Sequence, residues 1–212
     1  SKLMGERIVS AASISRQNQN TIFASTRFGN VLGTNGSVVP IFKKQIQNGG
    51  PITITDERMT RFIMSISDAA KLVLDSIPLS QGGEVFVTKM PVVSISKLAD
   101  AMIEALSKKT IIKKKFIGTK PGEKLYEELM SDEETSRSIE LDRYFVVLPT
   151  MGKTRSEIIS GYKKVKHTTV TNPYNSSAEY TLTTSETLDK LREYGLLDLP
   201  AHHNTNRHWP IN

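Results

Sequence analysis

Apolar residues recur at helical spacing in several parts of the chain. Near its start, Leu3, Met4, Ile8, Val9 and Ala12 share one face of a predicted helix. The same spacing predicts further helices over residues 38–46, 67–77, 94–106, 125–130 and 185–194. Each of these stretches has one apolar face, and we expect that face to be buried in the protein interior.

Between these helices lie short stretches of β-branched and aromatic residues, which are typical of strands. They cover residues 21–28, 52–55, 60–64, 84–88, 110–117 and 144–148. Residues 151–177 are polar and are predicted to be irregular, and residues 200–212 are predicted to be a flexible tail. Because strands and helices alternate early in the chain, we predict an α/β protein with a mostly parallel sheet.

Composition excludes several classes of protein. The 212 residues are 38% hydrophobic and 24% charged, which is too apolar for a disordered chain. No apolar run approaches the roughly 20 residues that span a bilayer, and no secretory signal is visible. The chain has no cysteine, which fits a reducing compartment, so we expect a cytoplasmic protein.

The formal net charge of +6 fits an anionic small molecule as well as it fits a nucleic acid. The densest group of lysines, within residues 108–115, surrounds Ile111 and Ile112 and lacks interleaved aromatic residues, so we disfavour a nucleic-acid partner. The chain has four histidines, His167, His202, His203 and His208. The last three lie in the predicted tail with no carboxylate or thiol partner at ligand spacing, and no metal site is predicted.

Three segments have residues suited to binding an anion. The first, Arg27-Phe28-Gly29-Asn30-Val31-Leu32-Gly33, is a strand end that leads into a glycine-rich loop and a helix start. Ligands of parallel sheets bind outside the carboxyl ends of strands, and exposed loop amides suit anionic oxygens. Taken alone, this segment is also compatible with an ordinary strand-to-helix turn.

The second segment places Arg61 beside Thr60, before a short apolar strand. A guanidinium can donate two hydrogen bonds to a phosphate, although a surface arginine paired with Asp56 or Glu57 explains the segment equally well. In the third segment, a Pro-Gly turn separates Lys120 from Glu123. Such a cation and carboxylate can hold the diphosphate and ribose of a nucleotide, or can simply be a solvated helix start.

Together these segments resemble the extended short-chain dehydrogenase/reductase superfamily. Within it the chain resembles the polysaccharide-biosynthesis branch of UDP-N-acetylglucosamine 4,6-dehydratases, which serve capsule and O-antigen synthesis. The similarity is carried by the strings TRFGNVLGTNGSVVPIFKKQI, GGPITITDERMTRFIMSISDAAKLVL, GGEVFVTKM and IGTKPGEKLYEELMSDEE, with NPYNSS further on. It covers nearly all of residues 1–199.

The resemblance implies a role for particular residues of this chain. Lys2 matches the lysine of a Tyr-x-x-x-Lys signature, which would hold the nicotinamide ribose. Arg61 matches the diphosphate arginine, Glu123 the acceptor for the ribose hydroxyls, and Lys120 a position where relatives often have arginine. The remaining implied substrate contacts are Asn30 and Val31 at the sugar diphosphate, and Gly36, Ser37, Val38 and Val39 at the uridine.

The sequence departs from this family in one large respect. It contains neither G-x-G-x-x-G nor G-x-x-G-x-x-G, and it lacks the Thr-Asp-Lys segment that supplies the family's acid and base. We therefore expect no catalytic residue in this chain, which would be the C-terminal part of a longer enzyme and inactive alone. The resemblance implies NAD or NADP as cofactor of that enzyme, the missing N-terminal half as a partner, and a homo-oligomer.

The expected organisation has two domains. Residues 1–33 and 62–90 would be the second half of a doubly wound, Rossmann-like parallel sheet that binds NAD. Residues 34–61 and 91–199 would form a smaller α+β domain for the nucleotide sugar. The expected activity is a 4,6-dehydratase, with or without 5-epimerase activity; a UDP-sugar 4-epimerase and a non-catalytic nucleotide-binding or interaction module are the alternatives.

Overall fold

The computed structural model describes residues 2–15, 20–34, 36–107, 110–119 and 121–198. The chain forms two compact units and passes between them several times. Unit 1 comprises Ser1–Asn30, Thr60–Val92 and Tyr126–Thr181. Unit 2 comprises Val31–Met59, Val93–Leu125 and Leu182–Asn212.

Unit 1 is built on a mixed sheet with the strand order β1-β5-β10-β9 among the described residues. Its strands are β1 (Ser25–Arg27), β5 (Val85–Thr88), β9 (Ser138–Glu140) and β10 (Tyr144–Val147). β1 is parallel to β5, whereas β10 runs antiparallel to both β5 and β9. Every residue of β5 is buried, as expected for a strand covered on both faces.

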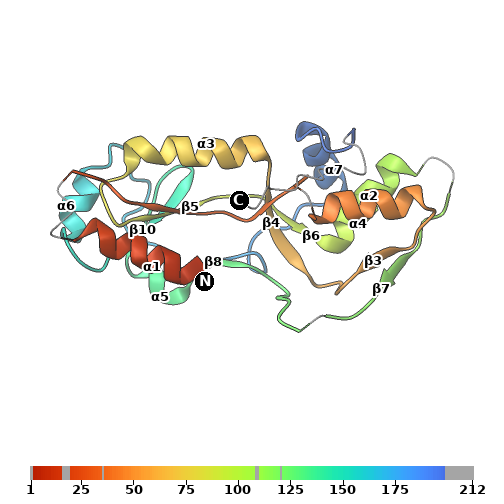
Figure 1. Ribbon diagram of the computed structural model, residues 1–212, viewed down its shortest axis with the longest axis horizontal. Coiled ribbons are helices and arrows are strands. Elements are labelled where there is room, and N and C mark those ends of the chain that lie inside the picture. Colours follow the sequence, from red (N-terminus) through yellow and green to blue (C-terminus); the bar gives the residue numbers. More distant parts are fainter. Residues whose placement is uncertain (1, 16–19, 35, 108–109, 120, 199–212) are drawn as a thin grey trace, which may run out of the picture. The chain divides into compact units, whose positions relative to one another are not determined.

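Helices cover both faces of this sheet (Figure 1). The two main ones are α1 (Lys2–Ser13) and α3 (Ile66–Ser76), which lie on opposite sides of the strands. α3 starts at a capping box in which Ser65 and Asp68 exchange hydrogen bonds. The core under α3 contains Leu72, Phe86 and Ile139, each at most 1% exposed.

Shorter elements complete unit 1. They are β4 (Thr60–Met64), the 3-10 helix η1 (Ile77–Leu79), β8 (Glu128–Met130), α5 (Asp132–Thr135), α6 (Arg155–Ser160) and β11 (Tyr174–Asn175). β8 pairs antiparallel with β11. β4 lies between β2 (Asn30–Val31) and β6 (Val92–Ser94), the strands at which the chain leaves unit 1.

Unit 2 packs helices on a short parallel strand pair. Its elements are α2 (Val38–Gln47), β3 (Ile52–Ile54), α4 (Ile95–Leu106), β7 (Lys114–Phe116) and α7 (Thr184–Glu193). β3 pairs with β7, and α4 contacts α2, β3 and α7. Leu98 and Met102 of α4 are fully buried, which makes this helix the centre of the unit.

The predicted α/β class with parallel strands is confirmed, but the sheet of unit 1 is mixed, not mostly parallel as expected, because β10 pairs antiparallel on both of its sides. The helix expected over residues 125–130 is wrong, because residues 128–130 form β8 and pair with β11. Within the stretch predicted to be irregular, Thr154 and Glu157 form a capping box that starts α6. In the part of the chain described here, no helix is both long and apolar enough to cross a bilayer.

The compact units have different boundaries from the domains expected from the sequence. Residues 126–181 were expected in the nucleotide-sugar domain, but they belong to unit 1. The reason is that β10 pairs with β5 and so extends the sheet that β1 begins. Which unit binds which ligand remains a prediction. The expected tail at residues 200–212 lies outside the described residues.

Candidate functional site

Asn30 and Arg61, two of the predicted diphosphate contacts, meet at one carboxylate in unit 1. The carboxamide of Asn30 donates to both carboxylate oxygens of Glu127, at 2.6 and 3.1 Å, when its nitrogen is oriented toward them. Nε of Arg61 lies 3.9 Å from Oε1 of the same carboxylate. Arg61 also donates through Nη1 to the Thr60 carbonyl at 2.7 Å, which fixes the guanidinium close to β4.

Ser176, which is fully buried, holds the backbone of this region in place. Its amide donates to the carbonyl of Glu127 at 2.8 Å, and its hydroxyl accepts from the amide of Glu127 at 2.9 Å. The same hydroxyl lies 2.9 Å from Oγ1 of Thr60. The NPYNSS segment therefore joins the strand that carries Arg61 to the residue that Asn30 contacts.

Gly29 explains how the loop before Asn30 comes so close to β4. A Cβ at this position would lie 2.6 Å from the carbonyl oxygen of Phe62, which is closer than side chains tolerate. Glycine is thus required here by the approach of two backbones. Phe62 in turn packs against Tyr174, with ring centroids 4.5 Å apart.

Other predicted substrate contacts lie in unit 2. Glu123 is half-buried and accepts from Oγ1 of Thr55 at 3.2 Å. Ser37 precedes α2, and its buried Oγ has no hydrogen-bond partner among the described residues. Val38 is half-buried, whereas the side chain of Val39 is 1% exposed and belongs to the interior of the unit.

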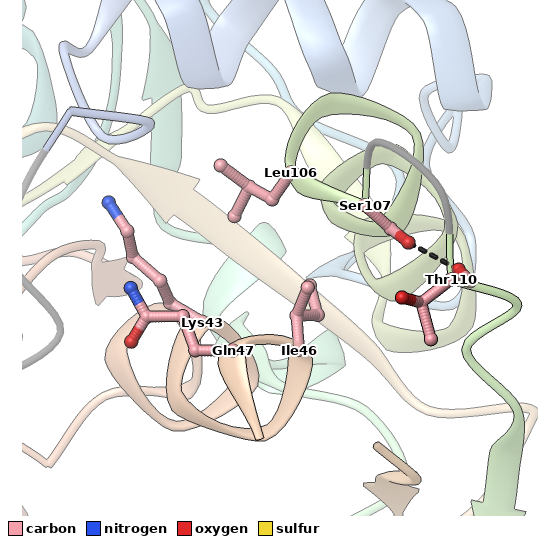
Figure 2. A pocket seen from close by; sticks show the side chains of 6 residues that line it. All are labelled: Lys43, Ile46, Gln47, Leu106, Ser107 and Thr110. Atoms are coloured by element: carbon pink, nitrogen blue, oxygen red, sulfur yellow. Dashed lines mark hydrogen bonds between the residues drawn. The ribbon is translucent and has the colours of Figure 1, made fainter. Parts of the chain in front are cut away.

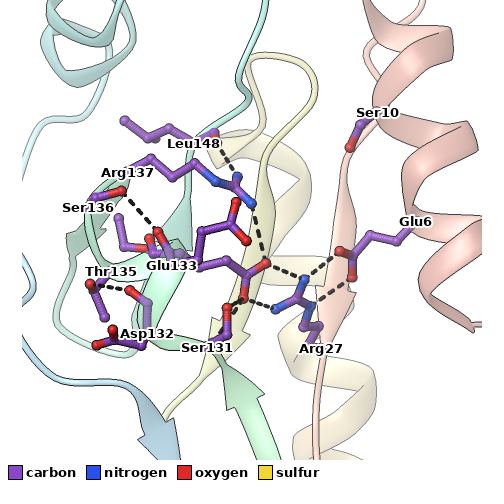
Figure 3. A network of polar contacts seen from close by, with 12 residues as sticks. Glu6, Ser10, Arg27, Ser131, Asp132, Glu133, Thr135, Ser136, Arg137 and Leu148 are labelled. Carbon is purple, nitrogen blue, oxygen red and sulfur yellow. Dashed lines mark hydrogen bonds and ion pairs between the residues drawn. The ribbon is translucent and has the colours of Figure 1, made fainter.

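Arg27, at the carboxyl end of β1, is the centre of a network of ion pairs (Figure 3). Its guanidinium donates to both oxygens of Glu6 in α1, at 2.5 and 2.7 Å, and to both oxygens of Glu134 in α5, at 2.7 Å. It also donates to the Leu129 carbonyl at 2.8 Å. Lys2, the predicted cofactor contact, is exposed and lies one helical turn before Glu6, so this network orients its helix.

In this network, burial and ion pairing shift the pKa values of Arg27 and Glu134 in opposite directions. Burial alone would lower the pKa of Arg27, but hydrogen bonds to Glu6 and Glu134 outweigh it and raise that pKa. Burial alone would likewise raise the pKa of Glu134, but the hydrogen bonds from Arg27 and Ser131 hold it below its ordinary value. Arg27 and Glu134 are therefore both charged at neutral pH.

A cavity of about 270 Å3 lies elsewhere in unit 2, near the ends of α2 and α4 (Figure 2). Its lining residues are Lys43, Ile46, Gln47, Leu106, Ser107 and Thr110. None of these is a predicted site residue. In the described ranges, histidines and carboxylates form no group of three suited to a metal ion.

The structure thus brings only some of the predicted site residues together. Asn30 and Arg61 share a partner in unit 1, while Val31, Gly36, Ser37, Val38, Val39 and Glu123 belong to unit 2. Lys120 lies outside the described residues. Sequence reasoning missed Glu127 and Ser176, although both lie in the strings that carried the resemblance.

The family model described as polysaccharide biosynthesis protein matches residues 1–149. This chain belongs to that family. The short-chain dehydrogenase/reductase resemblance of the polysaccharide-biosynthesis type, inferred from the motifs, is thereby confirmed.

Curated relatives of the family match at substantial identity. A protein of Methanocaldococcus jannaschii named uncharacterized membrane protein MJ1061 is 45% identical over 172 residues, covering 78% of this chain and 52% of the relative. The UDP-N-acetylglucosamine 4,6-dehydratase (inverting) of Campylobacter jejuni is 40% identical, covering 71% and 43%. The UDP-glucose 4-epimerase of Rickettsia prowazekii is 39% identical, covering 78% and 48%. The chain spans about half the length of these relatives.

A solved structure supports the fold over almost the whole chain. The X-ray structure of Pen from Bacillus thuringiensis has a TM-score of 0.81 and 36% sequence identity. The match covers 92% of this chain and 57% of the solved chain. The arrangement of α/β elements described above is therefore shared with a solved structure that extends beyond the matched region.

Proposed function

We propose that this chain carries the UDP-sugar-binding part of a UDP-N-acetylglucosamine 4,6-dehydratase of capsule or O-antigen biosynthesis. One observation carries the proposal: Asn30 and Arg61, which are distant in sequence, meet at a single anionic group. Nitrogen donors gathered in this way suit the oxygens of a diphosphate. The 40% identity to a protein named as such a dehydratase supports the choice of substrate.

Each part of the nucleotide sugar has a proposed contact. Asn30 and Arg61 would bind the diphosphate, with Val31 beside it. The uridine would lie against Gly36, Ser37 and the half-buried Val38. Glu123 would accept hydrogen bonds from the ribose hydroxyls, and Lys120 is proposed as a further substrate contact from its sequence position alone.

The cofactor enters the proposal only for the whole protein. Lys2 can contact a nicotinamide ribose, but the sequence contains no glycine-rich fingerprint for a dinucleotide pyrophosphate. The residues of this chain therefore do not suffice to hold NAD or NADP, and we derive no hydride transfer from them. We propose that the remaining length seen in relatives supplies that part and covers the outer edge of β1.

A 4-epimerase is the second candidate, favoured by the 39% identity to a protein named UDP-glucose 4-epimerase. The two activities differ in the mass of the product, because a dehydratase removes water and an epimerase does not. Incubation of the full-length protein with UDP-N-acetylglucosamine and mass spectrometry distinguishes them. A non-catalytic nucleotide-binding module would bind UDP and leave the sugar unchanged.

Calorimetric titration with UDP tests the proposed binding role. We expect Arg61→Ala to weaken UDP binding by about 1.5–3 kcal/mol, the range for a hydrogen bond to a charged group. Arg58→Ala is the matched control, because Arg58 is three residues away, exposed and paired with Asp56. If the wild-type chain binds no UDP, or if both variants bind it equally, the proposal is wrong.

A further inference from the structure

Glu127 occupies the position at which an anionic ligand of Asn30 and Arg61 would be expected. Its carboxylate accepts both hydrogen bonds from Asn30 and lies 3.9 Å from Nε of Arg61. The side chain is 28% exposed, so solvent and solutes can reach it. The two groups proposed to receive a diphosphate already face a negative charge that belongs to the protein.

This placement is fixed by the backbone. Ser176 bonds both the amide and the carbonyl of Glu127, and its hydroxyl is within hydrogen-bond distance of Thr60, the residue before Arg61. Glu127 and Arg61 are therefore held together by a residue that is itself fully buried. The contact is a consequence of the fold and is unlike the pairing of two mobile surface side chains.

At this position the carboxylate of Glu127 and a bound diphosphate would repel each other and compete for the same hydrogen-bond donors. Both are anions, and like charges a few ångströms apart repel each other strongly where solvent screening is incomplete. The hydrogens of Asn30 that bond to Glu127 cannot at the same time bond to phosphate oxygens. A diphosphate that binds Asn30 and Arg61 must therefore take these donors from Glu127.

We propose that Glu127 is an internal competitor that the diphosphate of the substrate displaces. This inference rests on the proposed function, because it takes Asn30 and Arg61 as the diphosphate contacts. The side chain of Glu127 keeps these donors in position without ligand and makes every anion compete for them. A ligand with two linked phosphates displaces it more readily than one with a single charge, so Glu127 favours nucleoside diphosphates over weaker anions.

The titration with UDP is repeated on Glu127→Gln to test this. The glutamine carbonyl can still accept a hydrogen bond from Asn30, but the competing charge is gone. We expect UDP to bind about two- to fivefold more tightly than to wild type, as removal of one partly exposed charge contact implies. The affinity for uridine, which has no phosphate, is expected to stay the same.

Glu128→Gln is the matched control, because it removes the same charge from an exposed neighbouring residue. The inference is overturned if Glu127→Gln binds UDP no more tightly than Glu128→Gln does. It is also overturned if UDP and uridine gain equally. Failure of the wild-type chain to bind UDP rejects the proposed function and this inference together, whereas binding by wild type without the expected gain in Glu127→Gln rejects the inference alone.

An NMR measurement on the wild-type chain gives an answer even if Glu127→Gln does not fold. The side-chain NH2 signals of Asn30 and the Nε–H signal of Arg61 report directly on their hydrogen-bond partners. Saturating UDP is expected to shift both sets of signals, whereas saturating uridine leaves them in place. If UDP binds and both sets stay unchanged, Glu127 is not displaced and the inference fails.

Discussion

Helices α1 and α4 have the same length, 12 residues, and both have an apolar face in their sequence. Yet they are buried to very different extents. α4 buries Leu98 and Met102 completely, whereas no residue of α1, all of which are described, is buried. Leu3 and Ile8 of α1 are 61% and 62% exposed. An amphipathic pattern thus shows which face of a helix can be covered, but not whether the same chain covers it.

Two strands within unit 1 show a similar contrast. β5 is wholly buried, whereas the residues of β1 are only half-buried and β1 is at the end of the strand order. A parallel strand is normally covered on both faces, and an edge strand is normally protected from pairing with other chains. We therefore propose that the side of unit 1 formed by α1 and β1 is where a further polypeptide segment packs.

We expect the two helices to differ most in how much the truncation of one leucine lowers the free energy of unfolding. Leu98→Ala leaves a cavity in unit 2 and is expected to lower the free energy of unfolding by about 2–5 kcal/mol. Leu3→Ala, its counterpart on α1, is expected to change it by less than about 0.5 kcal/mol. Urea unfolding followed by circular dichroism measures both. Equal losses would show that α1 is buried in solution and would contradict the comparison.

Because α1 lacks buried apolar residues, polar contacts contribute much of its attachment to the strands, chiefly the ion pair of Glu6 with Arg27 and the hydrogen bond from Ser10 to the Gly83 carbonyl. Arg27→Met leaves the carboxylates of Glu6 and Glu134 without their shared cation, and these side chains are only 16% and 11% exposed. We expect a loss of about 2–3 kcal/mol, somewhat less than for a fully buried pair. The control Arg58→Met, at an exposed ion pair, should cost less than about 1 kcal/mol. A loss no larger than the control's would show that the network does not hold α1.

The smallest expected effect is a pH dependence of the contribution that Arg27 makes to stability. The pKa of Glu134 is held below its ordinary value of 4.5, so its pairing with Arg27 stabilises the fold fully above about pH 4.5. This contribution is lost as the pH falls through the lowered pKa. The difference between wild type and Arg27→Met should therefore shrink in acid, while that between wild type and Leu98→Ala persists. Unfolding curves at neutral and acid pH measure this, and parallel behaviour of the two variants would be the contrary result.

Local patterns predicted much of the fold. The helices that became α2, α3, α4 and α7 and the strand that became β5 follow from apolar spacing and β-propensity. The predicted helix over residues 125–130 was wrong because Leu125, Leu129 and Met130 also fit helical spacing. Residues 128–130 instead form β8, in which Met130 pairs with Tyr174 of β11, 44 positions further along the chain. Local spacing does not reveal such a pairing.

The candidate site was only partly visible in the sequence for the same reason. Asn30 and Arg61 were found because the family resemblance implies a role for their positions. Glu127, Ser176 and the Arg27 network were missed, because their contacts join residues far apart, such as Thr60 with Ser176. The capping box at Thr154 and Glu157 was a local signal that could have predicted α6.

The central claim is the proposal that Asn30 and Arg61 of unit 1 bind the diphosphate of a nucleoside diphosphate sugar. A crystal structure of the chain with UDP-N-acetylglucosamine tests it most directly. The account predicts diphosphate oxygens within hydrogen-bond distance of Asn30 and Arg61, and Glu127 displaced from both donors. A ligand bound elsewhere, for example in the cavity beside Lys43, with Asn30 and Arg61 still facing Glu127, would contradict it.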